Sequence, residues 1–212
     1  MIQKFTTFLF LSLFTTSAYA QIQPLPDFVQ LPGAPATGSA EDQSDYAQNL
    51  SLQNSRTPDD CARAATEVKI TLASFFGSPF GPLSDQEVSR YNQLFESLYL
   101  EANGYISITK QQWQRPRPYI AHPDLKPCIK LESSFSYPSG HSALAEFYAR
   151  ALIVLFPDRA DVLKARAKQI ALDRNIGGVH YPSDIRDGNL LGDQIFDHED
   201  QTGDLTRKIL SF

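Results

Sequence analysis

The strongest constraint on the fold is a repeated pattern of helix starts, because no segment of the chain alternates apolar and polar residues as a half-buried strand does. Ser39, Thr57 and Ser84 each precede acidic residues that favour a helix N-terminus. After Ser84, apolar residues recur at helical intervals up to Gly104, where we expect the helix to stop. No internal repeat is present. The pattern predicts an all-α helical bundle.

Further helices are expected in the second half of the chain. Pro116 and Pro118 must end the first of them near Gln114, since proline removes a backbone donor and clashes with the preceding turn. The predicted ranges are approximately 106–114, 139–156, 160–174, 183–198 and 204–210.

The first twenty residues have the layout of a secretory signal peptide, with a basic residue, the apolar run Phe5 to Phe14 and small residues ending at Ala20. A membrane anchor is the alternative, but the run is short for a span and carries several Thr and Ser. Cleavage near Ala20 predicts a periplasmic or secreted protein. The expected division is 1–20 signal peptide, 21–38 Pro-rich N-terminal arm and 39–212 single helical domain.

The composition limits the partners. A formal charge of -5 gives no general reason to expect a nucleic acid polymer, and the apolar stretch 143–156 is broken by Glu146 and Arg150, so stable membrane insertion is not expected. Export to an oxidising compartment favours a disulfide between Cys61 and Cys128, with two buried thiols as the alternative. The sequence leaves the oligomeric state open, a homo-oligomer included.

Three segments concentrate residues that an ordinary core or surface does not need: 110–118, 137–141 and 174–184. In the first, Lys110 and Arg117 can meet at a helix end, although a solvated basic stretch is the favoured explanation if this segment is taken alone. In the second, Ser139 and Gly140 begin a helix, whose amides form an anion site.

The third segment places His180 four residues before Asp184 at the start of a helix. A carboxylate on Nδ1 leaves Nε2 unprotonated and nucleophilic. Together the segments supply a nucleophile, a second histidine at His141 and cations around a tetrahedral dianion. Metal binding is the competing use of these residue types, but the histidines lack the paired spacing of zinc sites.

Lys110, Arg117 and Pro118, then Pro138-Ser139-Gly140-His141, then Arg174, His180 and Asp184 resemble, in order and spacing, the motifs of the type 2 phosphatidic acid phosphatase superfamily. Within it the chain looks like the secreted class A bacterial non-specific acid phosphatases. The resemblance implies an all-helical fold shared with vanadium-dependent haloperoxidases, no metal cofactor, and hydrolysis of small-molecule phosphate monoesters through a phosphohistidine.

The resemblance also implies roles. His180 is the nucleophile, Asp184 orients it, and His141 is the general acid. Phosphate-binding roles fall to the remaining motif residues, namely Lys110, Arg117, Ser139, Gly140 and Arg174. The family pattern usually has Ser where this chain has Asp173; we expect the Asp173 carboxylate to point away from Arg174, because adjacent helix residues diverge by about 100°.

Other functions stay open from the sequence. One is a vanadium-dependent haloperoxidase, although such enzymes resemble much longer chains. Another is a non-catalytic phosphate-binding module, which would leave the two histidines without a use. A third keeps the chemistry on a lipid phosphate or pyrophosphate. The segment with Phe75, Phe76 and Phe80 can form an apolar lip for such a substrate, but we favour core and turn for it.

Overall fold

The computed structural model describes residues 23–212, and the protein is all-α over this range, as predicted: within it the chain forms helices and loops with only an isolated β-bridge. The predicted signal peptide lies outside the described residues. The α-helices are α1 (Ala40–Ser55), α2 (Pro58–Thr66), α3 (Leu72–Phe76), α4 (Asp85–Trp113), α5 (Pro118–Ala121), α6 (Gly140–Leu155), α7 (Ala160–Ile176), α8 (Pro182–Glu199) and α9 (Asp204–Leu210), and η1 (Pro157–Arg159) is a 3-10 turn.

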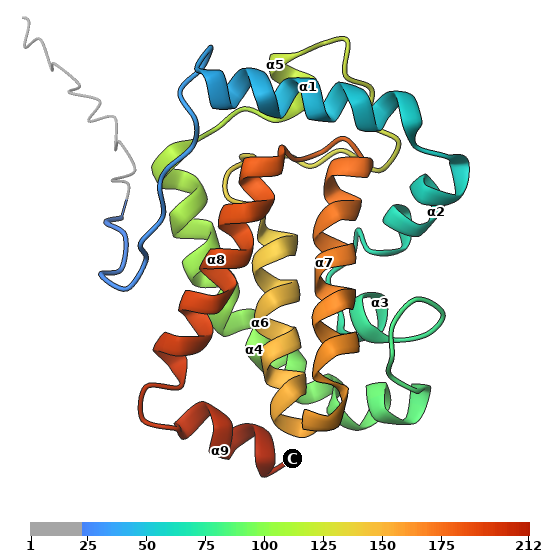
Figure 1. Ribbon diagram of the computed structural model, residues 1–212. Coiled ribbons are helices and arrows are strands. Elements are labelled where there is room, and N and C mark those ends of the chain that lie inside the picture. The colour runs from blue at the N-terminus through green and yellow to red at the C-terminus, as the bar shows by residue number, and fades with distance from the viewer. Residues whose placement is uncertain (1–22) are drawn as a thin grey trace, which may run out of the picture.

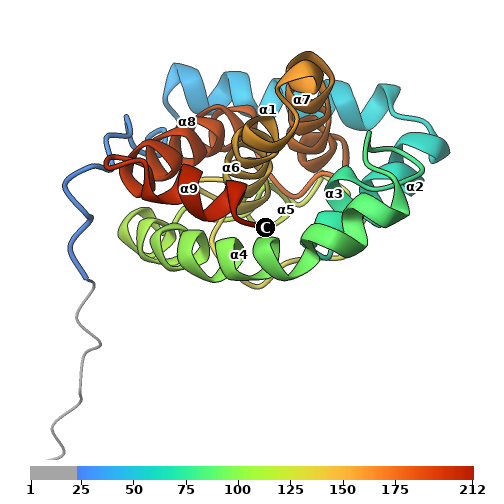
Figure 2. The same cartoon turned by 90° about the horizontal axis from the view of Figure 1, so that it is seen from below.

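The helices surround α6, which is buried along most of its length. In Figure 1, α6, α7 and α8 run side by side, and α1 lies across one end of them. Figure 2 shows α6 between α4 and α7. The starts of α6 and α8 and the ends of α4 and α7 therefore meet at the end of the bundle that α1 covers.

Side-chain caps fix where the helices begin. The hydroxyls of Ser39, Thr57, Ser84 and Ser139 each accept a hydrogen bond from a backbone amide in the first turn that follows, which satisfies a donor that has no partner within the helix. These caps agree with the starts that the sequence predicts.

The predicted stop at Gly104 is wrong, because α4 continues through it to Trp113. Gly104 is exposed, and a glycine inside a helix costs only about 1 kcal/mol relative to alanine. The buried residues on either side, Ala102 and Ile106, keep the apolar face continuous, and their burial offsets that cost. The helix ends before Pro116, as the sequence predicts, and Gln114 at its end is in the left-handed conformation with φ 47°.

Two short helices were not predicted, α3 and α5, and α7 runs two residues beyond Arg174. Residues 23–38 contain no helix but are held against the bundle: Val29 is part of the core, and the Phe28 ring stacks on His198 with centroids 4.1 Å apart. The Pro-rich segment is thus an extended strap.

Two glycines on α8 set how closely it approaches α6. A Cβ atom at Gly188 would lie 2.5 Å from the Ser139 carbonyl oxygen, and one at Gly192 would lie 2.3 Å from that of Ala143. Any larger residue would separate the helices. The spacing of four places both glycines on one face of α8, so the start of α6 is held against the start of α8.

Several tertiary features bear on the site. Cys61 in α2 forms a disulfide with Cys128, which ties α2 to the loop that follows α5.

Phe75 and Phe76 are fully buried whereas Phe80 is 45% exposed, so the first two belong to the core. Between residues 23 and 212, the structure contains no helix with the length and apolar character of a membrane span.

Candidate active site

His180 and Asp184 form a buried pair at the start of α8. The Nδ1 of His180 lies 3.2 Å from Oδ2 of Asp184, and both side chains are 0–1% exposed. The histidine precedes the helix and the aspartate lies in its first turn, so the chain reversal between them brings the two side chains together.

The protonation state of His180 follows from its second neighbour. Nη1 of Arg117 lies 2.9 Å from Nε2 of His180. A guanidinium can only donate, so Nε2 accepts and the single ring proton resides on Nδ1, facing Asp184. This is the tautomer that a nucleophilic Nε2 requires.

Burial, with Arg117 and Lys110 as the next causes, holds the pKa of His180 well below its ordinary value. The imidazole therefore stays neutral over the range in which proteins usually work.

Asp184 is held by a network that the sequence did not reveal. Its carboxylate accepts hydrogen bonds from Arg115 at 2.8 Å, Ser136 at 2.5 Å and the Tyr181 amide at 2.9 Å. The Arg115 guanidinium also pairs with Asp45 of α1 at 2.9 Å. In the sequence Arg115 belongs to a stretch that resembles a solvated basic run, but in the structure it is 5% exposed and orients the aspartate.

Three predicted cations converge beside His180. Arg117 and Arg174 are 0–1% exposed, and Lys110 is 9% exposed. The Lys110 ammonium donates to the backbone oxygens of Phe135 and Pro138 at 2.8 and 2.7 Å. Together the three come from the ends of α4 and α7 and from the loop between α4 and α5.

Only part of the Arg174 guanidinium is hydrogen-bonded within the part of the chain that the structure describes. Its Nη2 donates to Glu132 at 2.7 Å, but among the described residues Nε and Nη1 have no hydrogen-bond partner although both are buried. A buried donor without a partner costs free energy, and most such groups in native proteins are satisfied. Two buried donors of this guanidinium are therefore available to a ligand that accepts hydrogen bonds.

His141 lies in the first turn of α6. Its Nδ1 is 3.7 Å from Oε1 of Glu132, and its Nε2 is 3.3 Å from the Val68 carbonyl oxygen. Burial, followed by the positive charge of Arg174, lowers the pKa of His141 to about 3.

The groups at the N-terminus of α6 are partly engaged within the protein. The Ser139 amide donates to the Asp184 backbone oxygen at 2.8 Å, and its hydroxyl accepts from the Ser142 amide. Ser139 thus joins α6 to α8. Gly140 lies beside the Lys110 side chain, because a Cβ atom there would approach Cε of Lys110 to 3.6 Å.

Glu132 is a second candidate, after Arg115, that the sequence did not indicate. Its carboxylate contacts Arg117 at 2.5 Å and Arg174 at 2.7 Å. It lies in an irregular loop outside the three motifs, where no periodicity or spacing marks it. Only the tertiary structure brings it among the cations.

Asp173 points away from the site, as we expected. Its carboxylate accepts from Nη2 of Arg63 in α2 at 2.8 Å and from Gln169 at 3.0 Å. Arg174, one residue later and on another face of α7, keeps its guanidinium for the site.

A cavity of about 170 Å³ opens on the His141 side of the site. Lys110, Glu132, Gly140 and His141 line it. The other lining residues are Ile70, Asn103, Ile106, Ser107, Ser134 and Leu144.

The segment that carries these motifs resembles a known protein family. The profile described as the PAP2 superfamily matches residues 92–193, which include every motif residue named above. The chain carries a PAP2 superfamily domain.

Curated relatives of this chain are acid phosphatases. The non-specific acid phosphatase of Providencia stuartii is 27% identical over 172 residues, which are 77% of this chain and 69% of the relative. That of Salmonella typhimurium is 26% identical over 151 residues, 69% of this chain and 60% of the relative. These matches confirm the predicted superfamily and the predicted enzyme class, a phosphatase acting on phosphoric monoesters.

A solved structure shares the fold. The crystal structure of a transmembrane PAP2 type phosphatidylglycerolphosphate phosphatase from Bacillus subtilis superposes with a TM-score of 0.57 at 19% identity, covering 79% of this chain and 88% of that one. At this identity the likeness concerns the helical fold alone.

Proposed function

We propose that this PAP2 chain hydrolyses phosphate monoesters without a metal ion, through a phosphohistidine on His180. The observation that carries the proposal is the state of His180, which is neutral, has its Nδ1 proton facing Asp184 and has Nε2 directed at the Arg117 guanidinium. A module that only bound phosphate would need the cations but not an oriented nucleophile.

The proposed reaction uses these groups in turn. Nε2 of His180 attacks phosphorus, the bond from phosphorus to the ester oxygen breaks, and His141 gives a proton to the leaving oxygen. Arg117, Arg174 and Lys110 stabilise the charge on the phosphoryl oxygens. Water then attacks the phosphohistidine, His141 takes a proton from that water, and the bond from phosphorus to nitrogen breaks, which releases phosphate.

The protonation of His141 depends on the substrate. In the free protein the pKa of His141 is about 3, because burial and Arg174 disfavour its charged form. A bound phosphate ester brings negative charge beside the ring and raises this pKa. The acid is therefore formed with the substrate in place.

The test is rapid-quench turnover of an aryl phosphate in the presence of a chelator, with an alkaline quench that preserves phosphohistidine. We expect chelator-resistant phosphate release and a transient phosphoenzyme, both lost in His180→Gln. The matched control is His122→Gln, a partly exposed histidine whose ring stacks on Tyr46.

The two alternative functions, a binding module and a haloperoxidase, predict different results. Phosphate binding without turnover in the wild type would refute the mechanism and favour a binding module. Halide oxidation that requires vanadate and peroxide, without phosphate release, would favour a haloperoxidase.

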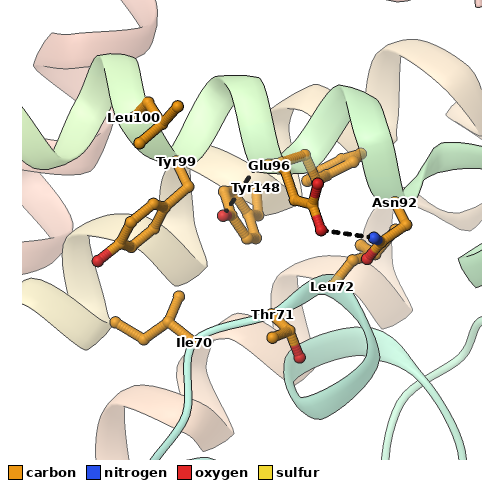
Figure 3. A pocket seen from close by; sticks show the side chains of 9 residues that line it. Ile70, Thr71, Leu72, Asn92, Glu96, Tyr99, Leu100 and Tyr148 are labelled. Carbon is orange, nitrogen blue, oxygen red and sulfur yellow. Dashed lines mark hydrogen bonds between the residues drawn. The ribbon is translucent and has the colours of Figure 1, made fainter.

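His141 protonates the leaving group in this mechanism, so the space beside His141 indicates which kind of leaving group fits. A second cavity of about 210 Å³ adjoins the first, and Ile70 lines both. Figure 3 shows it between α4 and the segment around Ile70, with Tyr99 and Tyr148 on its walls. Its lining is mainly apolar, apart from a hydrogen-bonded pair at its far end, Asn92 and Glu96.

Two helices carry residues from one cavity to the other. On α6, His141, Leu144 and Tyr148 are spaced three and four apart and so share a face. On α4, the lining runs from Lys110 to Tyr99, a distance of about 16 Å along the helix axis. We therefore propose a phosphate monoester with an extended apolar leaving group.

Export to the periplasm or medium remains part of the proposal. It is supported by the signal-like composition of residues 1–20 and by the Cys61–Cys128 disulfide, which is typical of oxidising compartments.

A further inference from the structure

Glu132 is an acidic side chain placed among groups that must bind an anion, and the mechanism above gives it no role. Its Oε2 atom is 2.5 Å from Nη2 of Arg117, and its Oε1 atom is 2.7 Å from Nη2 of Arg174. The carboxylate thus spans two of the three cations, as the oxygens of a phosphoryl group would.

The same carboxylate also lies between the two histidines. Oε1 is 3.7 Å from Nδ1 of His141, and the guanidinium of Arg117 that holds Oε2 also contacts Nε2 of His180. A phosphoryl group that is attacked by His180, while His141 protonates its leaving oxygen, must lie at this position. Carboxylate and phosphoryl group cannot occupy it together.

We propose that Glu132 is a built-in competitor that determines the affinity of the site for phosphate and phosphate esters. The identity of the anion rests on the proposed function. In the absence of substrate, Glu132 neutralises Arg117 and Arg174, and substrate binds by displacing its carboxylate. Glu132 is accordingly an affinity-determining residue, distinct from the groups that carry out the reaction.

The backbone of Glu132 is fixed, so the displacement is a rotation of the side chain. The Tyr119 hydroxyl donates to the Glu132 carbonyl oxygen at 2.7 Å and accepts from its amide at 3.2 Å. Nearby, Cys128 is held by the disulfide. The cavity beside the carboxylate has polar walls at Asn103 and Ser107, which give the rotated side chain hydrogen-bonding partners.

Glu132 competes as an anion at all ordinary pH values. Burial opposes its ionisation, but the positive charges of the Arg117 and Arg174 guanidiniums outweigh burial and hold the pKa of Glu132 well below its usual range. Acidification in the working range therefore does not remove the competitor, and only binding does.

The experiment is calorimetric titration of the purified protein with inorganic phosphate, comparing wild type with Glu132→Gln. The amide keeps the size and one acceptor of the side chain but removes its charge. Because the apparent affinity of the wild type is reduced by the fraction of molecules whose site is occupied by the carboxylate, we expect the dissociation constant to fall about tenfold or more in the variant.

Two further variants make the result decisive. Glu132→Asp keeps the charge but is one methylene shorter, so it spans the two arginines less well, and we expect it to bind phosphate with intermediate affinity even if Glu132→Gln does not fold. Glu101 of α4 forms an ion pair with Lys208 of α9. Glu101→Gln removes the same charge there, and we expect no change in phosphate affinity.

Equal or weaker phosphate binding by Glu132→Gln, or by Glu132→Asp if only that variant folds, would overturn the proposal. That outcome would make Glu132 a positioning residue for the two arginines. Turnover of an aryl phosphate, measured on the same samples, reports separately on the proposed function. Tighter binding by Glu132→Gln without turnover in any sample would refute the phosphatase mechanism and leave the competitor role standing.

Discussion

Lys110 illustrates how one buried residue can limit the pH range of the site. Burial, assisted by the positive charge of Arg117, lowers the pKa of Lys110 to about 7. The lysine is therefore charged below about pH 7 and loses its charge above it. Its folded pKa lies below the unfolded value, so the charged lysine costs stability at low pH, and this cost is relieved as pH rises from about 7 towards 10.5.

Activity should accordingly fall on the alkaline side as Lys110 loses its proton. We expect kcat/KM for an aryl phosphate to decrease above about pH 7 in the wild type. Lys110→Arg keeps the charge at every pH used, so its alkaline limb should move to higher pH. Lys130→Arg, an exposed position in the loop after α5, is the matched control. An unchanged limb in Lys110→Arg would assign the titration to another group.

At the scale of elements, the catalytic groups depend on contacts that join helices. Arg115 connects the segment after α4 to Asp45 of α1 and to Asp184 of α8. The glycines at 188 and 192 bring α8 onto α6. Each contact fixes one helix end relative to another, which is how groups on separate helices reach hydrogen-bonding distance.

Asp173 belongs to this class of contacts, since it links α7 to α2 through Arg63. Its side chain is fully buried and Arg63 is 22% exposed. We expect Asp173→Asn to lower the free energy of unfolding by about 1–3 kcal/mol, because a hydrogen-bonded charge is lost, and to leave kcat/KM unchanged. Denaturant unfolding and steady-state kinetics measure the two effects.

A surface ion pair provides the comparison. Asp193 pairs with Arg150 at 3.4 Å and is 49% exposed, so Asp193→Asn should cost less than about 1 kcal/mol. A large loss of turnover in Asp173→Asn without loss of stability would mean that Asp173 acts on the site directly, contrary to its orientation.

At the scale of the whole molecule, the packing of α4 against α6 beside the segment around Ile70 creates the two adjoining cavities. We expect kcat/KM for linear alkyl phosphates to rise with chain length by about fourfold per methylene while the chain fills them, since each buried methylene contributes about 0.8 kcal/mol. Steady-state kinetics on an ethyl-to-octyl series measures this dependence.

Ile70→Asp places a charge where the cavities meet, so the dependence on chain length should disappear while ethyl phosphate is still hydrolysed. Leu172→Asp introduces the same charge at an exposed position on α7 and should retain the dependence. A wild type indifferent to chain length would show that the leaving group does not enter these cavities.

The sequence by itself determined the helical class, most helix boundaries and the three motifs, because caps, prolines and apolar spacing act through neighbours in the chain. The motifs were sufficient to predict the His180–Asp184 contact, which spans a single turn. The predicted stop at Gly104 was wrong because the free-energy cost of a glycine inside a helix is outweighed by the burial of Ala102 and Ile106 on either side of it.

Only the tertiary structure decided the rest. Arg115 and Glu132 have no local signature, and their importance comes from partners on other elements, Asp45 for the first and Arg174 for the second. Burial also set the pKa values of Lys110 and His141, because desolvation depends on every element packed around a group. Such properties belong to the assembled site, so no segment of the sequence contains them.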